Sequence, residues 1–175
     1  MLPIQETLTS HLLLSTIRMK CLTYIAVLVL FSFSSIAQSI TVTGSWYASV
    51  PATTVTEAGN DYDSGFFLES TTNQTEVKIN TSSGSGTKTW VVSVSKLDVN
   101  WDSRFVLAAK RTGDGTGSGL TLGTSYITLT NNNQIFFRGE NNVNKIPIQY
   151  KLSGISVLIP SGDYSTNVVY TYQEP

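Results

Sequence analysis

Apolar and polar side chains alternate in short segments along the chain from residue 40 onward. A period of two places successive side chains on opposite faces of a β-strand, so each of these segments has one face suited to burial. The alternating segments are 40–46, 77–79, 90–94, 105–109 and 146–152. From residue 38 onward no segment shows a helical period of useful length, so we expect the backbone hydrogen bonds to be made mainly in sheets.

Further segments rich in β-branched and aromatic residues are predicted to be strands, at 65–69, 125–130, 134–138, 155–159 and 164–173. Clusters of turn residues at 82–86 and 131–133 separate some of them. The pattern therefore predicts about ten short strands, as in a β-sandwich. Pro147 cannot donate a hydrogen bond to a ladder, so we expect the 146–152 strand to lie at a sheet edge or to begin there.

Charged residues make up only 13% of the chain, and the formal net charge is −1. An average soluble domain carries about 25% charged residues. Binding to nucleic acid or to an anionic membrane surface requires a concentration of basic side chains, which this sequence lacks. We therefore expect no nucleic-acid partner.

The N-terminal part has the order of a secretory signal peptide. Met19 and Lys20 precede an apolar run at 21–31, and small residues follow up to Ala37. The apolar run is shorter than the ~20 residues that span a bilayer, so we expect no membrane span in the mature chain. We predict a signal peptide at 19–37, with cleavage between Ala37 and Gln38.

Residues 1–18 precede this signal, and we expect them to be an extension that results from an incorrectly assigned start, with Met19 as the true start. The mature β-sandwich domain is then 38–175. This organisation predicts a protein that is secreted, periplasmic or displayed on the cell surface.

Residues 38–175 contain no histidine, cysteine or methionine. A histidine base, a cysteine nucleophile and the usual zinc sites are thereby excluded, and no disulfide can stabilise the domain. Paired carboxylates, as in glycosidases, remain available, but no spacing singles out one pair. We therefore predict no catalytic residues and no cofactor.

Two other motifs also favour structural interpretations. Residues 60–65 resemble the start of a calcium loop, but the position that should supply the closing glutamate is Thr72, so we predict a polar turn and no metal site. The glycine-rich run at 113–119 lacks the Gly-Lys-Ser/Thr ending of a phosphate-binding loop. We expect a flexible hairpin loop there.

Aromatic side chains are the remaining candidates for a ligand site, because they can stack on sugar rings. The candidates are Trp46, Tyr47, Trp90, Trp101, Phe136 and Tyr172. Trp90 belongs to an alternating apolar face, so we expect it in the core. Trp101 is the better exposed candidate, although a loop tryptophan that is partly buried and bonds through its indole N–H is the more common arrangement.

Near the C-terminus, Leu158, Pro160, Tyr164 and Val168 resemble the Leu-x-Pro-x-x-x-Tyr-x-x-x-Val pattern of fibronectin type III and related Ig-like domains. The resemblance implies an Ig-like antiparallel β-sandwich in which Tyr164 begins a strand and its hydroxyl bonds back to the preceding corner. It also implies that Leu158 and Val168 pack inward. The pattern departs from the family because only one strand follows the corner.

A C-terminal strand without its neighbour also resembles chaperone-usher fimbrial subunits of bacteria, whose incomplete Ig-like fold is completed by a neighbour's N-terminal strand. Gly162 is fourteenth from the C-terminus, the segment 166–172 alternates, and 40–44 is a plausible donor strand. The chain departs from this pattern in lacking a cysteine pair and in having its last tyrosine fourth from the end.

These observations predict an exported, all-β, Ig-like sandwich that acts as a structural or adhesive protein without catalytic activity, with a fimbrial-type subunit as one form of it. Its partners would be a further copy or another surface subunit, bound by strand pairing, or a glycan. The alternative is a carbohydrate-binding module or small glycosidase that uses exposed aromatic residues and carboxylates.

Overall fold

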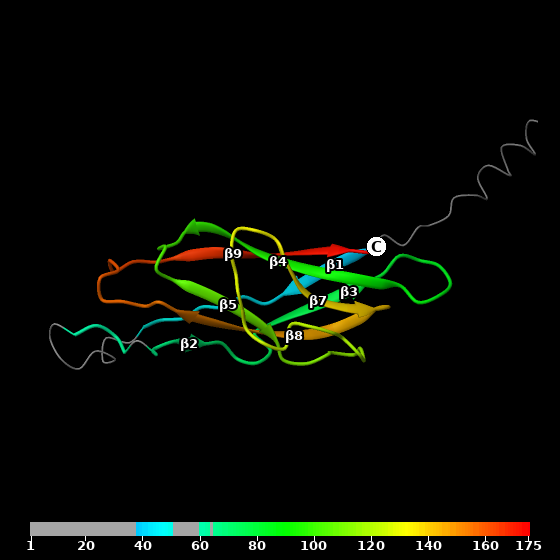
Figure 1. The fold of residues 1–175 in the computed structure, drawn as a ribbon, viewed down its shortest axis with the longest axis horizontal. Coiled ribbons are helices and arrows are strands. Elements are labelled where there is room, and N and C mark those ends of the chain that lie inside the picture. Colours follow the sequence, from blue (N-terminus) through cyan, green and yellow to red (C-terminus); the bar gives the residue numbers. More distant parts are fainter. Residues whose placement is uncertain (1–37, 51–59, 64) are drawn as a thin grey trace, which may run out of the picture. The chain divides into compact units, whose positions relative to one another are not determined.

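A computed structural model describes residues 38–50, 60–63 and 65–175 (Figure 1). Residues Ala37–Pro175 form one compact unit. The described residues contain nine strands and no helix, and the strands form two antiparallel sheets that pack together. The predicted all-β antiparallel sandwich is therefore confirmed.

The larger sheet has the strand order β1-β3-β8-β5-β6, with β2 also paired to β8. Its strands are β1 (Ser39–Thr43), β2 (Leu68–Glu69), β3 (Thr75–Asn80), β5 (Val106–Arg111), β6 (Ile127–Thr128) and β8 (Val143–Ser153). The smaller sheet has the order β7-β4-β9. Its strands are β4 (Thr89–Asn100), β7 (Gln134–Glu140) and β9 (Ser165–Gln173). All the pairings are antiparallel.

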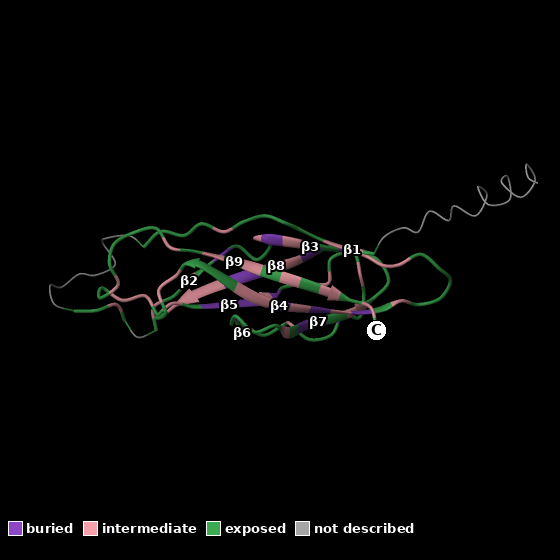
Figure 2. Ribbon diagram, turned by 90° about the horizontal axis from the view of Figure 1, so that it is seen from above, coloured by how far each residue is buried: buried purple, intermediate pink, exposed green. Residues whose placement is uncertain are grey.

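The core lies between the two sheets and is built from the inward positions of the alternating segments (Figure 2). The largest fully buried side chains are Trp90, Phe136, Phe137, Ile79, Leu129, Ile146, Ile148, Val77, Val92, Val94 and Val143. Full burial of one such side chain stabilises a fold by about 1.5–3 kcal/mol. Period-two alternation therefore positions these residues, and their packing joins the sheets without any disulfide.

The segment 155–159, predicted as a strand, is a turn instead. Gly154 has a φ of +76°, in the left-handed region that favours glycine. The Ile159 amide then donates to the Ser156 carbonyl oxygen at 3.0 Å, which closes a turn. The apolar residues of this segment belong to a loop that joins β8 to β9, so their composition was a misleading signal for a strand.

The expectation that Pro147 marks an edge strand or a strand start is wrong, because β8 is central, with β3 on one side and β5 on the other. In an antiparallel ladder the N–H and C=O of one residue point toward the same neighbour. The Pro147 carbonyl accepts from the Thr112 amide, which lies just beyond the end of β5. The missing N–H therefore faces the side where β5 has already ended, and the pairing with β3 loses nothing.

The predicted extension at 1–18, the signal peptide at 19–37 and the residue Ala37 lie outside the described residues, which begin with Gln38. Within the described part of the chain, no helix is long and apolar enough to cross a membrane.

Candidate functional site

The predicted corner before β9 places its tyrosine as the resemblance implies. Tyr164 directly precedes β9, and its hydroxyl donates to the Pro160 carbonyl oxygen at 2.7 Å. Val168 packs against the core. Leu158, however, is 75% exposed, so the expectation that it packs inward is wrong. The 155–159 turn keeps this side chain on the surface. At Gly162, an added Cβ would meet no other atom within 4 Å.

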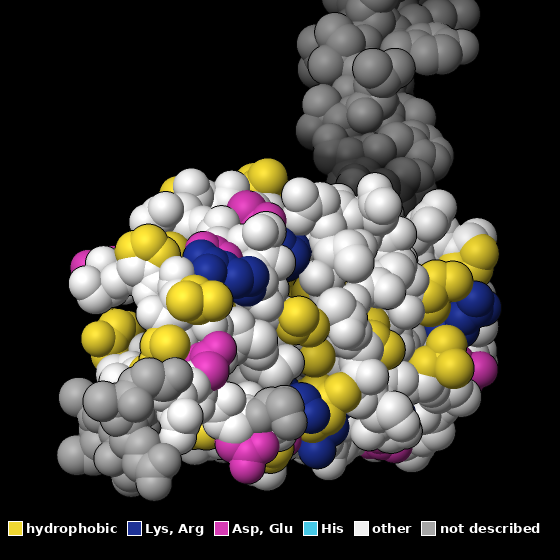
Figure 3. Space-filling model, turned by 60° about the vertical axis from the view of Figure 1, so that its left-hand side comes forward, with side chains coloured by type: hydrophobic (Ala, Val, Ile, Leu, Met, Phe, Trp, Pro, Cys, Tyr) yellow, Lys and Arg dark blue, Asp and Glu magenta, His cyan; other side chains and the backbone are white. Residues whose placement is uncertain are grey.

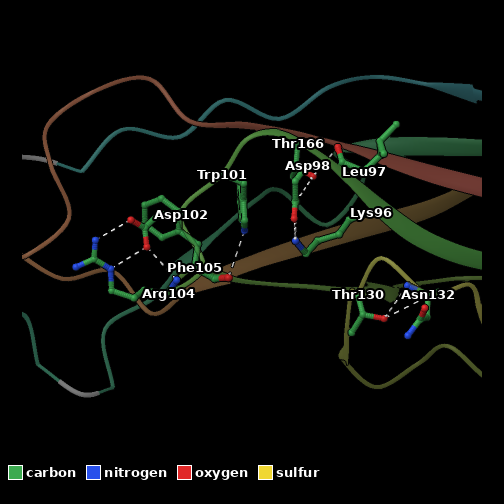
Figure 4. Close-up of polar contacts among 10 residues, drawn as sticks. All are labelled: Lys96, Leu97, Asp98, Trp101, Asp102, Arg104, Phe105, Thr130, Asn132 and Thr166. Atoms are coloured by element: carbon green, nitrogen blue, oxygen red, sulfur yellow. Dashed lines mark hydrogen bonds and ion pairs between the residues drawn. The ribbon is translucent and has the colours of Figure 1, made fainter.

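Trp101 follows β4 and is only partly exposed (Figure 4). Its indole Nε1–H donates to the Phe105 carbonyl oxygen at 3.3 Å, and its ring meets the Phe105 ring edge-on at 5.3 Å. The Phe105 ring in turn contacts Tyr164 at 5.1 Å. Trp101 is thus engaged in a local aromatic cluster at the start of β9, which favours the structural interpretation of this residue.

Ion pairs surround this cluster (Figure 4). Asp102 accepts from the side chain of Arg104 at 2.7 and 2.8 Å, and these bonds lower the pKa of Asp102 to about 2. Lys96 binds Asp98 and lies 5.5 Å from the centre of the Trp101 ring, and its hydrogen bond lowers the pKa of Asp98. A glycosidase acid requires a raised pKa, so these two aspartates are poor candidates for that role.

The other aromatic candidates are distributed between core and surface. Trp90 and Phe136 are buried in the core, as expected for Trp90. Trp46 stacks on Tyr150 at 6.2 Å, and Tyr172 donates its hydroxyl to the Glu174 carboxylate. Tyr47 is 86% exposed. The structure does not bring the six predicted platform residues together at one place.

The polar segment at 60–65 contains two aspartates that bond to the backbone. Asp61 accepts from the Ser156 hydroxyl and the Val157 amide, and these bonds lower the pKa of Asp61. Asp63 accepts from the Gly65 amide at 3.0 Å. These contacts fit the predicted polar turn, which here also fixes the loop before β9. Among the described residues no group of three His, Cys, Asp or Glu side chains could hold a metal ion.

The glycine-rich loop at 113–119 is held in place by a buried arginine that the sequence interpretation missed. Arg111 donates to the carbonyl oxygens of Leu120 and Leu122 at 3.0 and 2.9 Å and forms an ion pair with Asp114. Within the loop, the Thr116 amide donates to the Asn144 carbonyl oxygen of β8. The expected flexible hairpin is therefore a loop fixed to the sandwich, and the only signal was one arginine at an inward position.

A second group missed by sequence interpretation lies on the outer face of the larger sheet. The ammonium groups of Lys110 and Lys151 lie 4.5 and 5.1 Å from the centre of the Tyr126 ring. The Tyr126 hydroxyl donates to Glu69 at 3.0 Å, and burial, followed by this bond, raises the pKa of Tyr126 to about 12. An open hollow of about 460 Å³ adjoins this group at Lys110 and is also lined by Gln149. The residues come from four parts of the chain, so no local motif reveals them.

Hydroxyl groups connect the two sheets at the side of the sandwich where β1 and β9 lie. The Tyr150 hydroxyl bonds to the Thr75 hydroxyl at 2.9 Å and to the Tyr170 hydroxyl at 2.8 Å. Burial raises the pKa of Tyr150 and raises that of Tyr170 well above its usual range. The network joins β3 and β8 of one sheet to β9 of the other.

The last strand is open along one edge. β9 pairs with β4 from Ser165 to Gln173, and no other strand of the described residues pairs with it. Its burial alternates between exposed and half-buried residues along its length (Figure 2). The half-buried Val168, Tyr170 and Tyr172 pack against the core. The strand carries no charged residue and no proline. The segment 40–44, predicted as a donor strand, is largely occupied by β1, which pairs with β3 of its own chain.

The face of the molecule drawn in Figure 3 has few charged side chains, and both signs are interspersed on it. Hydrophobic side chains are scattered among uncharged polar atoms there. This face therefore offers no patch of one charge that would attract a polyanion.

Comparison of the chain with protein-family models, with curated proteins and with solved structures finds no match.

Proposed function

We propose that this chain is an exported structural or adhesive β-sandwich protein of Ig-like type, without catalytic activity, that binds its partner by strand addition to β9. The observation that carries the proposal is the open edge of β9, which is nine residues long and uncharged. In strand addition, the backbone hydrogen bonds of an open edge supply affinity to an added strand.

The lack of protection on β9 supports this proposal. Proteins usually guard a sheet edge with lysine, proline, a bulge, a very short strand or a covering loop. Among the other edge strands, β1 has five residues and β6 has two, and β7 is bridged by Thr121. β9 is longer than β1 and β6 and carries neither lysine nor proline, which is expected of a strand whose partner is supplied from outside the chain.

The proposal is tested by light scattering on a chain that begins at Gln38, with and without Val168→Pro. The Val168 amide points away from β4 to the open edge, because its partner Lys96 directs its own amide to Thr130 on the far side of β4. Proline at 168 therefore removes one edge donor and leaves the pairing with β4 intact. The matched control is Val168→Ala, which shortens the same side chain and keeps the amide. We expect the native chain and Val168→Ala to form larger assemblies and Val168→Pro to be monomeric.

Circular dichroism establishes that each variant is folded. A native chain that remains monomeric at every concentration, or a folded Val168→Pro variant that assembles like Val168→Ala, would contradict strand addition to β9.

A second candidate function, carbohydrate binding, is favoured by the open hollow that Lys110 and Gln149 line. Its volume of about 460 Å³ lies within the range of small-molecule sites. Lys110 can donate to sugar hydroxyls. Gln149 also lines the hollow, with its side-chain nitrogen held by the Ser70 carbonyl oxygen at 2.9 Å. The test is a glycan-binding screen of the native chain and Lys110→Met, with the exposed Lys78→Met as the control. Binding that Lys110→Met abolishes and Lys78→Met retains would support it, and no binding by the native chain would exclude it.

A further inference from the structure

The direction of the backbone groups of β9 follows from one hydrogen bond of β4. The Lys96 amide donates to the Thr130 carbonyl oxygen, on the side of β4 away from β9. Since both backbone groups of a residue in an antiparallel strand point to the same side, alternate residues of β4 face β9. Ser95 and Leu97 therefore exchange hydrogen bonds with their partners, Val169 and Asn167.

It follows that the intervening residues of β9 direct their N–H and C=O groups to the open edge. These residues are Thr166, Val168, Tyr170 and Tyr172. Their side chains are the half-buried, inward ones, so an added strand would meet backbone without displacing the exposed side chains. The exposed side chains beside this edge, from Asn167 to Gln173, carry no charge.

We propose that the occupant of this edge is β9 of a second copy of this chain, paired antiparallel about a two-fold axis at Val169. This inference rests on the proposed function and names its partner. An isologous contact requires a surface that is complementary to itself. The residues of β9 that face the open edge are the even-numbered ones. A two-fold axis through a single residue pairs even-numbered residues of one copy with even-numbered residues of the other, so each outward N–H and C=O meets an outward group of the second copy.

The register follows from the length of the strand. β9 runs from Ser165 to Gln173, and a two-fold axis at its middle residue, Val169, pairs its whole length. Val168 then bonds with Tyr170 of the second copy. Any other axis leaves backbone groups at one end of the strand without a partner, which is costly where they are shielded from water.

The side chains on the outer face suit the same arrangement. Val169 is 40% exposed, and two copies of it would lie directly opposite each other at the axis, as a close non-hydrogen-bonded pair. Leu97, opposite Asn167 on β4, is 60% exposed and diagonal to Val169. The pairing would produce one continuous six-stranded sheet and bring apolar side chains together with no like charges opposed.

The first test is cysteine cross-linking of the chain that begins at Gln38, which contains no native cysteine. Residues Ala37–Pro175 form a compact unit with its own core, so this chain is expected to fold alone. Val169→Cys should give a disulfide-linked dimer under mild oxidation, because the Cα atoms of a non-hydrogen-bonded pair lie about 4.5 Å apart. Thr171→Cys is the matched control, since its counterpart in the second copy would be four positions away. Cross-linking of Thr171→Cys in preference to Val169→Cys would overturn the register.

The second test is a charge exchange at the same exposed position. Val169→Lys and Val169→Glu should each weaken the dimer by about tenfold, because like charges would oppose each other at the axis. An equimolar mixture of the two variants should recover the dimer. If each variant alone dimerises as tightly as the native chain, or the mixture stays monomeric, the second copy is not paired through β9.

The two proposals can fail separately. If the native chain assembles, Val168→Pro prevents assembly, and yet Val169→Cys forms no disulfide, strand addition stands and pairing of β9 with itself is overturned. If the native chain never assembles, both are overturned.

Discussion

The sheet edges on one side of the sandwich are joined by segments of the chain, whereas those on the other side are not. On one side the chain passes from β6 to β7, and the residues between them serve both sheets: the Leu129 amide bonds to Leu107 of β5, and the Thr130 carbonyl oxygen accepts from Lys96 of β4. Thr121 then forms two hydrogen bonds of 3.0 Å with Arg138 and covers β7. On the other side β1 and β9 end their sheets, and nothing described in the chain bridges them by backbone hydrogen bonds.

A sandwich is therefore closed by connections that cross between its sheets. A crossing segment satisfies the edges of both sheets at once, whereas two strands that end their own sheets leave a row of backbone groups exposed. The side with the crossing is completed within the chain, and the side with the chain ends is where a partner can add a strand. Substitutions on either side can test this difference.

The largest effect is expected for Arg111→Ala on the closed side. Arg111 is buried and holds the loop that carries Thr121, through Leu120, Leu122 and Asp114. Its loss leaves the buried Leu120 carbonyl oxygen and the half-buried Leu122 carbonyl oxygen without this donor, so the free energy of unfolding should fall by about 2–4 kcal/mol, as measured by urea denaturation. Lys110→Ala, on the outer face of the same strand, is the control and should cost much less. Equal losses would show that the arginine does not fix this side.

The next effect concerns the hydroxyl network of the open side at alkaline pH. Because burial raises the pKa of Tyr150 and Tyr170, the unfolded chain ionises first, near pH 10, and the folded chain only at higher pH. Stability is therefore fully present below about pH 10 and should fall as the pH rises from there toward the folded pKa values, by at most about 1.4 kcal/mol per pH unit for each tyrosine. Denaturation of Tyr170→Phe should show a smaller slope.

The control for this experiment is Tyr47→Phe, which removes an exposed phenol. Its alkaline slope should equal that of the native chain. An unchanged slope in Tyr170→Phe would mean that the network does not hold the open side together.

A smaller loss is expected for Tyr164→Phe, at the corner that leads into β9. The variant removes only the hydrogen bond from the tyrosine hydroxyl to Pro160 and keeps the ring against Phe105. The free energy of unfolding should fall by about 0.5–1.5 kcal/mol, as measured by thermal denaturation. If the loss does not exceed that of Tyr47→Phe, the corner bond contributes nothing to the position of β9.

The smallest effect is local, at the end of β9. Glu174 accepts from the Ser82 amide and hydroxyl, and these bonds, together with that from Tyr172, lower the pKa of Glu174. The contact is thus present above the ordinary pKa of glutamate and is lost as the pH falls and the carboxylate is protonated. Hydrogen exchange at the Ser82 amide should speed up in Glu174→Ala at neutral pH, with global stability almost unchanged. Exchange that stays slow would show that another group protects this amide.

Much of the fold could be predicted from local patterns. Alternation placed Val77, Ile79, Trp90, Val92 and Val94 in the core, because the face on which a side chain lies depends only on its parity along the strand. The same local rule failed for 155–159, where Gly154 turns the chain. A different local rule, that proline marks an edge strand, failed for Pro147, because its missing N–H faces the side where the neighbouring strand β5 has already ended.

The candidate sites were less predictable. The aromatic platform that the sequence suggested does not form, since Trp46, Trp101 and Tyr172 each contact a different part of the fold. The group around Tyr126 and the hollow at Gln149 were missed, because their members are brought together only by pairing between distant strands. Contacts between strands that are distant in the chain cannot be predicted from a single sequence.

Local patterns were thus enough to predict the β-strands, a core made by alternation and the lack of disulfides, because parity and residue type act over a few neighbouring residues. Which strands lie at the edges, which edge stays open and which direction its backbone groups face became apparent only in the folded structure. Those properties depend on long-range pairing, where a strand acquires its neighbours from segments far away in the chain. The open edge of β9 is such a property, and it is the basis of the function proposed for this protein.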